Sequence, residues 1–559
     1  CHAPSAAALK EMLGTGAATN SFDDIERAGT ILICGCNPTQ NHPVVGARIK
    51  QAALHGTHLI VIDPREIELS KFADVHLQIH PGTNIPLLNG MASAIVEEGL
   101  FDPEFVRDRI ENWEAFAEFV HRYRPEVVSE LCGVEANLIR QAARVYAKNR
   151  PSMCFHGLGV TEHTQGTEGV MCLANLALIT GNIGKAGGGI NPLRGQNNVQ
   201  GAAHMGCDPN LLPGSIPLKT GARFFEEAWK AEIPVRNGLN LLQMMDAAEN
   251  GNLKLLWSIG YDALLTNPNR AASQRAFSKL ATVIVQDMFL NETARQFGTI
   301  FLPACSSFEK EGTFMNAERR VQRIRQVLSP RGNSKPDWEI LCSVAKVTGK
   351  GDSFSFTSPS DIWEEIRAVW PGGAGISYDR LDHGGLQWPC PADDHPGTKI
   401  LHQDTFASAK RAPLQCAEFK RSPEMGVKDY PLTLITGRTL QQFNAGTMTG
   451  RGGHKTLRTT DLLDVSPVDA QRMGIADGDD IRLCSRYGRT VLPIHITDSV
   501  ASGQLFATFH DPTSALNYVT GPFCDNRTST PEYKITAVRL EKISSTLLLP
   551  GYDGEPEIG

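Results

Sequence analysis

The sequence lacks several features that would assign a function class directly. No apolar run reaches the roughly 18 residues that a membrane-spanning helix needs. The net charge is -7, which is not the strongly basic balance of a nucleic-acid-binding protein. There is no G-x-x-x-x-G-K-[ST] loop, and no G-x-G-x-x-G stands between a predicted strand and a helix. We therefore predict a chain with no membrane span and no nucleic-acid partner.

Metal-binding cysteine motifs are missing as well. The chain has 13 cysteines, but no two of them have C-x2-C spacing, and the closely spaced run of an iron–sulfur site is absent. An odd number of scattered cysteines predicts reduced, mostly buried thiols in a cytoplasmic protein. The sequence begins at Cys1 rather than at Met. We expect it to be the C-terminal portion of a longer chain, or a numbering that begins late.

Alternating strands and helices dominate the first part of the chain. Residues 30–39 and 57–66 are short apolar runs that end in polar turns, and residues 42–56 between them have the pattern of a helix. A further strand and helix follow in 73–99. This order predicts a parallel sheet covered by helices. In such sheets, ligands bind at the carboxyl ends of the strands.

The same pattern returns in residues 253–330 and then changes. From residue 431 onwards, short strands separated by Gly-Asp turns predict a β-barrel. We predict an α/β fold with two parallel-sheet domains of the nucleotide-binding type and a C-terminal β-barrel-like domain. The expected division is 1–196 for the first α/β domain, 197–335 for the second, 336–430 for a connecting region and 431–559 for the barrel-like domain.

Polar residues gather where the predicted strands end. Asp63 and Asp262 follow two of them and could accept hydrogen bonds from guanine N–H groups or ribose hydroxyls. Backbone N–H groups at the following helix starts could hold phosphates. The glycines at 157–159 and 187–189 more often form turns and caps when such motifs occur alone. The number of polar loops nevertheless predicts a large, multiply phosphorylated ligand.

Two further motifs could carry chemistry. The stretch NPLRGQNNVQG (191–201) fits neither helix nor strand periodicity, and its amides could donate and accept along the edge of a pterin. Arg194 suits a carboxylate, which a guanidinium grips through two hydrogen bonds, although a structural ion pair is the alternative. Cys1 offers a soft ligand for a transition metal, and His2 could take up a proton. As a bare dipeptide, Cys1-His2 is also compatible with chance.

Together these motifs resemble the molybdopterin oxidoreductase superfamily, and most closely its molybdenum formate dehydrogenase catalytic subunits. The resemblance covers essentially the whole chain, and RGQNNVQG is its most specific part. GRTLQQFNAGTMT looks most like the soluble NAD-dependent branch. The other matching segments are Cys1-His2 before APSAA, GCNPTQNHPV, VIDPRE, NPLRGQNNVQGAAHMG, VIVQDMFLNETA and FEKEGTFMN.

The resemblance implies a DMSO-reductase-like fold and a reversible two-electron oxidation of formate to CO2. It implies molybdenum or tungsten held by two molybdopterin guanine dinucleotides, with Cys1 as the protein ligand and Arg194 as the formate anchor. Hydrogen would leave as a hydride to the metal centre or as a proton to a base. His2 would be that base in the second scheme, or would tune the site in the first.

The resemblance also assigns cofactor contacts and partners. Iron–sulfur clusters are expected outside the present segment, because the cysteines and the relay lysine that open the family's chains are absent here. Partner subunits would carry iron–sulfur, flavin and NAD sites. The predicted cofactor-binding residues are Cys36, Asn37, Asp63, Pro64, Arg65, Gly82, Thr83, Asn84, Gly157, Gly159, Arg194, Gln196, Asn197, Gly260, Asp262, Gln286, Asp287, Thr293, Glu311, Asn316, Arg438, Gln442, Asn517 and Lys534.

Three alternatives remain open at this stage. A reductase for nitrate or another oxoanion would share the fold and cofactor. A non-catalytic relative, like the large electron-transfer subunit of respiratory complex I, would keep the fold without the metal. An α/β protein with an ordinary dinucleotide is disfavoured by the missing glycine fingerprint.

Overall fold

The computed structural model describes residues 1–407 and 409–543. Its first region is built on a five-stranded parallel sheet with the strand order β3-β2-β1-β5-β6. In register, Cys34 of β1 lies beside Ile62 of β2 and His156 of β5, so the loops after these strands leave the same edge of the sheet. The strands are β1 (Thr30–Cys34), β2 (His58–Ile62), β3 (Val75–Leu77), β5 (Ser152–His156) and β6 (Gly189–Pro192).

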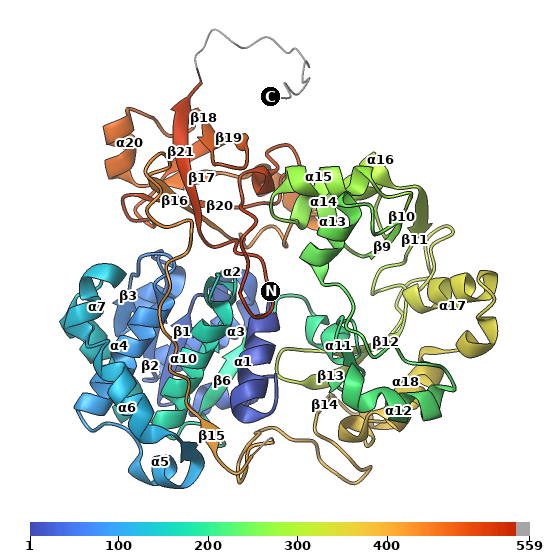
Figure 1. The fold of residues 1–559 in the computed structure, drawn as a ribbon, viewed down its shortest axis with the longest axis horizontal. Helices are drawn as coiled ribbons and strands as arrows, with labels where there is room; N and C mark the ends of the chain where they lie inside the picture. The colour runs from blue at the N-terminus through green and yellow to red at the C-terminus, as the bar shows by residue number, and fades with distance from the viewer. Residues whose placement is uncertain (408, 544–559) are drawn as a thin grey trace.

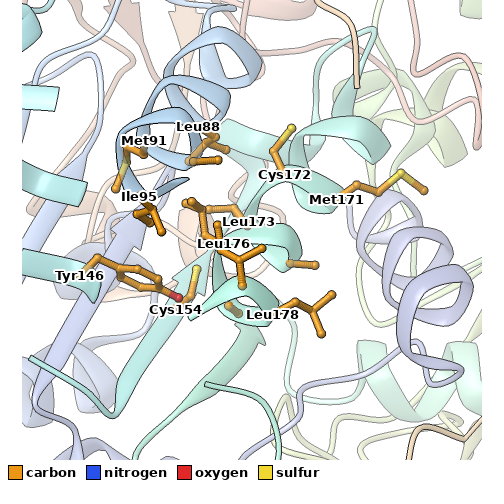
Figure 2. Packing of buried hydrophobic residues seen from close by; sticks show 14 of the residues in the cluster. Leu88, Met91, Ile95, Tyr146, Cys154, Met171, Cys172, Leu173, Leu176 and Leu178 are labelled. Atoms are coloured by element: carbon orange, nitrogen blue, oxygen red, sulfur yellow. The ribbon is translucent and has the colours of Figure 1, made fainter. Parts of the chain in front are cut away.

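Both faces of this sheet are covered, because successive strand side chains point to opposite sides. Leu32 and Cys34 pack into the larger core, whereas Ile31 and Ile33 pack into a second core that includes α3 (Pro43–Leu54). Figure 2 shows the larger core, where labelled side chains from neighbouring helices and from β5 meet. Its main helices are α1 (Ala3–Leu13), α4 (Asn84–Glu97), α8 (Ala136–Lys148) and α10 (Gly166–Ile179).

Residues 101–150 are mostly helical and flank this core. They form α5 (Pro103–Arg109), α6 (Trp113–His121), α7 (Pro125–Cys132) and α8, with the short strand β4 (Ile110–Glu111) between α5 and α6.

The second region contains a smaller parallel sheet with the strand order β11-β10-β9. Val283 and Val285 of β10 pack against the helices on one face, together with Phe277. The opposite face is open, and Leu255, Ile259 and Ile300 are 45–50% exposed. The elements are β9 (Leu255–Ile259), β10 (Thr282–Asp287), β11 (Ile300–Pro303), α13 (Leu241–Glu249), α14 (Ala263–Thr266), α15 (Arg270–Ser278) and α16 (Glu292–Phe297).

The segment predicted as a connecting region, 336–430, contains structure of its own and joins both neighbouring parts. Its strand β14 (Leu386–Gln387) completes an antiparallel sheet with β12 (Gly312–Met315) and β13 (Arg320–Ile324), and β15 (Ala412–Pro413) pairs with β4. The predicted boundary at 335 therefore cuts through a sheet. The helices here are α17 (Asp337–Val347), α18 (Pro359–Val369) and α19 (Tyr378–Leu381).

The C-terminal region is a closed barrel, as predicted. Leucines such as Leu434, Leu483 and Leu505 fill it. Its strands are β16 (Leu432–Thr436), β17 (Leu463–Val465), β18 (Asp480–Cys484), β19 (Arg489–Ile496), β20 (Gln504–Ala507) and β21 (Thr536–Lys542), with α20 (Pro467–Met473) outside. The end of the predicted domain, 544–559, lies outside the described residues.

The chain start lies near the centre of the molecule, close to where the three regions meet (Figure 1). Across 1–407 and 409–543, no helix combines the length and the apolar composition that a membrane crossing requires.

Candidate active site

A cavity of about 670 Å³ opens where the two sheets and the barrel converge. The predicted residues on its wall come from all three regions, and several of them follow directly after strands of the two parallel sheets. They are Cys1, Cys36, Asn37, Asp63, Pro64, Arg65, Gly82, Asn84, Gly157, Gly159, Gln196, Asn197, Gly260, Asp262, Gln286, Asp287, Arg438, Asn517 and Lys534.

Two of the predicted glycines are required by close packing of one loop against another. A Cβ atom on Gly157 would lie 2.6 Å from the Cβ of Cys36, and one on Gly159 would lie 2.7 Å from the Cα of Gly35. Gly35 itself has a positive φ of 57°. The loops after β1 and β5 therefore approach closely enough that a side chain at Gly157 or Gly159 would collide with the neighbouring loop.

Cys1, a free and exposed cysteine, lies at this wall, and its backbone oxygen accepts a hydrogen bond of 2.6 Å from Thr161 Oγ1. His2 and Arg194 lie behind the wall, with 4% and 6% of their surface exposed. The Nη2 of Arg194 donates to the carbonyl oxygen of Gly16 at 3.1 Å. Burial and the nearby Arg194 charge hold the pKa of His2 well below its usual range.

Cationic side chains enter the cavity from the first region and the barrel. Lys534 Nζ donates to the carbonyl oxygen of Thr436 at 2.7 Å and lies 3.4 Å from Glu162 Oε2. Burial lowers the pKa of Lys534, while the Glu162 carboxylate opposes this shift. Burial also lowers the pKa of Arg65 and Arg438, with nearby carboxylates opposing it. These groups suit a ligand with several phosphates.

Six predicted cofactor residues do not reach the wall: Arg194, which lies behind it, and five others. Thr293 Oγ1 donates to Asp262 at 2.7 Å, and Thr83 Oγ1 donates to the backbone of the preceding turn at 2.6 Å. Glu311 forms an ion pair of 3.7 Å with an arginine. The side chains of Asn316 and Gln442 hold their own loops. The side chains of these five residues bond to neighbouring protein groups. They therefore stabilise the loops around the cavity and do not line it.

Several wall residues were missed by the sequence reasoning. His42 Nε2 donates to the carbonyl oxygen of Arg194 at 2.8 Å, and His163 Nε2 donates to that of Gly159 at 3.0 Å. Lys310 forms an ion pair with Asp337, which also accepts from Gln286 at 2.8 Å. His42 stands inside the quoted segment GCNPTQNHPV, so its motif gave a usable signal. Lys310 stands inside the quoted segment FEKEGTFMN, but its partner Asp337 lies outside every quoted segment, so no motif indicated the pair.

The residues present fit a large polar cofactor with a metal. His42 Nδ1, His163 Nδ1 and Gln286 Oε1 are buried without a hydrogen-bond partner, which is costly unless a ligand satisfies them. Nowhere in residues 1–407 and 409–543 do three His, Cys, Asp or Glu side chains form a group that could hold a metal. A metal at Cys1 would therefore need most of its ligands from a cofactor, and a thiolate suits a soft transition metal.

Comparisons with known proteins agree with this geometry. Residues 1–347 match the molybdopterin oxidoreductase family, and residues 432–537 match the molydopterin dinucleotide binding domain. The chain is 40% identical to the F420-dependent formate dehydrogenase subunit alpha of Methanocaldococcus jannaschii, covering 97% of this chain and 80% of that protein. It is 34% identical to formate dehydrogenase H of Escherichia coli, covering 97% and 77%.

A solved structure supports the DMSO-reductase-like fold. Acetylene hydratase from Pelobacter acetylenicus superposes with a TM-score of 0.77 at 18% identity, covering 97% of this chain and 81% of that one. The cofactor is therefore molybdenum or tungsten bound by molybdopterin guanine dinucleotides. From its matched domains and its relatives, this chain belongs to the molybdopterin oxidoreductase family and is the metal-dependent oxidoreductase that the cavity suggests.

Proposed function

We propose that the chain oxidises formate to CO2, reversibly, and passes the two electrons through iron–sulfur clusters to NAD+ on partner subunits in the cytoplasm. The observation that best supports formate as the substrate is the environment of Arg194. Relatives named as formate dehydrogenases, at 34–40% identity, support the same choice.

Arg194 is a buried cation without a carboxylate partner among the described residues. Its Nε has no hydrogen-bond partner, and burial lowers its pKa only to about 10, so it stays protonated at neutral pH. A buried guanidinium with free donors is stabilised by a small carboxylate, which can accept two parallel hydrogen bonds. The absence of a carboxylate partner supports substrate binding over a structural ion pair.

The reaction converts HCOO⁻ to CO2, one proton and two electrons. When bound, the metal–pterin centre supplies the acceptor for both electrons. Cys1 provides the protein thiolate to the metal, and Arg194 holds the carboxylate and orients its C–H bond, a proximity effect. His2 and Arg194 are themselves buried, so a charge on a bound carboxylate would be weakly screened by solvent at Arg194.

The electron acceptor needs its own test. The GRTLQQFNAGTMT segment favours NAD+, whereas two relatives at 37–40% identity are named F420-dependent. We keep NAD+ as the proposal, with flavin and iron–sulfur sites on partner subunits. Purified native complex would be assayed with formate and each acceptor in turn. Reduction of F420 but not of NAD+ would replace this part of the proposal.

The first experiment is elemental analysis of the purified native complex, followed by turnover with an artificial dye. About one molybdenum or tungsten per chain is expected for a site with one thiolate ligand. Formate-dependent dye reduction is expected. Turnover of nitrate without formate turnover would favour the oxoanion reductase, and a folded complex without either metal would favour the non-catalytic relative.

A further inference from the structure

A closed ring of hydrogen bonds joins the Cys1 segment to the Arg194 loop. His2 Nε2 lies 3.0 Å from the carbonyl oxygen of Leu193, and His2 Nδ1 lies 3.0 Å from Ser5 Oγ. Ser5 Oγ lies 2.8 Å from His156 Nε2. The backbone N–H of Leu193 donates to the carbonyl oxygen of His156 at 2.9 Å, which closes the ring.

The hydrogen positions in this ring follow from the chemistry of its members. A carbonyl oxygen can only accept, so His2 Nε2 carries a proton and donates to Leu193. With a neutral His2 ring, Nδ1 accepts the Ser5 hydroxyl proton, and the Ser5 oxygen in turn accepts the Nε2–H of His156. Both nitrogens of His2 are therefore engaged by the protein.

A histidine at position 156 should reduce the stability of the fold. It is fully buried at the end of β5, and its Nδ1 has no hydrogen-bond partner. An apolar side chain there would avoid the cost of a buried, unpaired nitrogen. Burial and Arg194 lower the pKa of His156 to about 3, in keeping with a neutral ring that donates through Nε2. Fold stability alone gives no reason for a histidine here.

We propose that Ser5 and His156 are positioning residues for the reaction. They fix the orientation of the His2 ring, and the ring in turn keeps the Cys1 segment and the Arg194 loop at a constant distance from each other. This rests on the proposed function of Cys1 and Arg194. His2 then acts through its position and not as the first proton acceptor, since neither ring nitrogen is free. The same kind of outer partner orients metal ligands in other metalloproteins.

The test compares Ser5→Ala, His156→Phe and His156→Gln in the complete native complex. Ser5→Ala removes the bridging hydroxyl, and His156→Phe removes the donor but keeps a ring. His156→Gln keeps an N–H donor at a similar reach. Ser93→Ala is the matched control, because Ser93 is also fully buried and its hydroxyl has no partner.

We expect kcat for formate to fall about 10- to 100-fold in Ser5→Ala and His156→Phe, as for other lost outer partners of a metal site. Formate KM should stay within about twofold, because the bond from His2 to Leu193 remains and Arg194 keeps its own contacts. His156→Gln should recover most of the turnover, and Ser93→Ala should match the parent. The paramagnetic resonance spectrum of the partly reduced metal should change only in the two impaired variants.

Two outcomes would overturn the proposal. One is parental kcat and an unchanged spectrum in Ser5→Ala and His156→Phe; the other is His156→Gln being as impaired as His156→Phe. If His156→Phe does not fold, Ser5→Ala decides alone, since it removes a single oxygen atom. A parent complex inactive on formate would refute the proposed function, whereas the spectra would still decide whether the ring positions the metal site.

Discussion

The two parallel sheets deliver polar loops to the same cavity, yet they are covered differently. All five residues of β1 are buried, whereas the ends of β9 and β11 are exposed. The sheet that is covered on both faces also carries the loops that hold Cys1 and Arg194. Polar loops can therefore line the cavity whenever the carboxyl ends of the strands are aligned, whether or not both faces of the sheet are covered. The residues proposed to react lie beside the sheet that is covered on both faces.

The largest expected effect concerns the packed side of this comparison. Cys1→Ala should abolish formate turnover, because the variant removes the soft ligand that the protein offers to the metal. Turnover with an artificial dye and metal content would be measured together. Gln286→Ala, on the rim of the second sheet, should retain measurable turnover. Near-normal activity of Cys1→Ala would show that the thiolate is dispensable and would remove the functional difference between the two sheets.

Arg194→Lys should raise formate KM about 10- to 100-fold. Lysine keeps the charge but loses the two-pronged donor, and a hydrogen bond to a charged group is worth about 1.5–3 kcal/mol. Steady-state kinetics over a range of formate concentrations would measure the change. Arg325→Lys is the control, since Arg325 is exposed and pairs with Asp382. An unchanged KM in Arg194→Lys would remove Arg194 from substrate binding.

Core substitutions would test the packing difference directly. Leu32→Ala in β1 should destabilise the protein by about 2–5 kcal/mol, the usual cost of truncating a fully buried leucine. Leu255→Ala in β9 should cost less than about 1 kcal/mol, because this side chain is 50% exposed. Urea unfolding midpoints of the two variants would be compared. Equal losses would show that the outer face of the second sheet is covered in the native complex.

Much of this architecture was predictable from local pattern. Apolar runs that stop at Gly, Asn or Asp located the strands and their carboxyl ends, and short strands separated by Gly-Asp turns from residue 431 located the barrel. The exposed face of β9 was not predictable, because Leu255, Trp257 and Ile259 look as apolar as the buried β1. Apolar composition alone does not report which faces are covered.

A site role could be proposed from the sequence where a single segment carried its own motif, as with Cys1, which lies on the cavity wall, and Arg194, which lies behind it. Contacts between segments that are distant in the sequence could not be predicted. The His156–Ser5 bond spans 151 positions, and His156 reads in the sequence as an ordinary strand residue. Thr293 and Gln442 were expected on the wall, but they bond to neighbouring protein groups, since motif position does not fix side-chain direction.

The smallest expected effect concerns the hydrogen bonds that connect each of the two sheet regions to the C-terminal part of the chain. Glu532 bridges the first region and the segment before the barrel, because it accepts from the backbone N–H of Thr164 at 2.8 Å and from the hydroxyl of Ser422. The second region instead uses the neutral Asn517, whose amide donates to the carbonyl oxygen of Leu265 at 2.9 Å. Only the first junction should therefore respond to pH.

Burial, with a smaller contribution from Glu424, raises the pKa of Glu532 from 4.5 to about 7. The folded state then binds this proton more tightly than the unfolded state. The stabilisation is complete below about pH 4.5 and is lost as the pH rises through about 7. Between pH 5 and pH 8, thermal unfolding of the parent should fall by about 2–4 °C more than that of Glu532→Gln, which cannot titrate. If the unfolding temperatures of the two proteins changed with pH in parallel, Glu532 would not titrate in this window. The two junctions would then differ in sequence but not in their pH dependence.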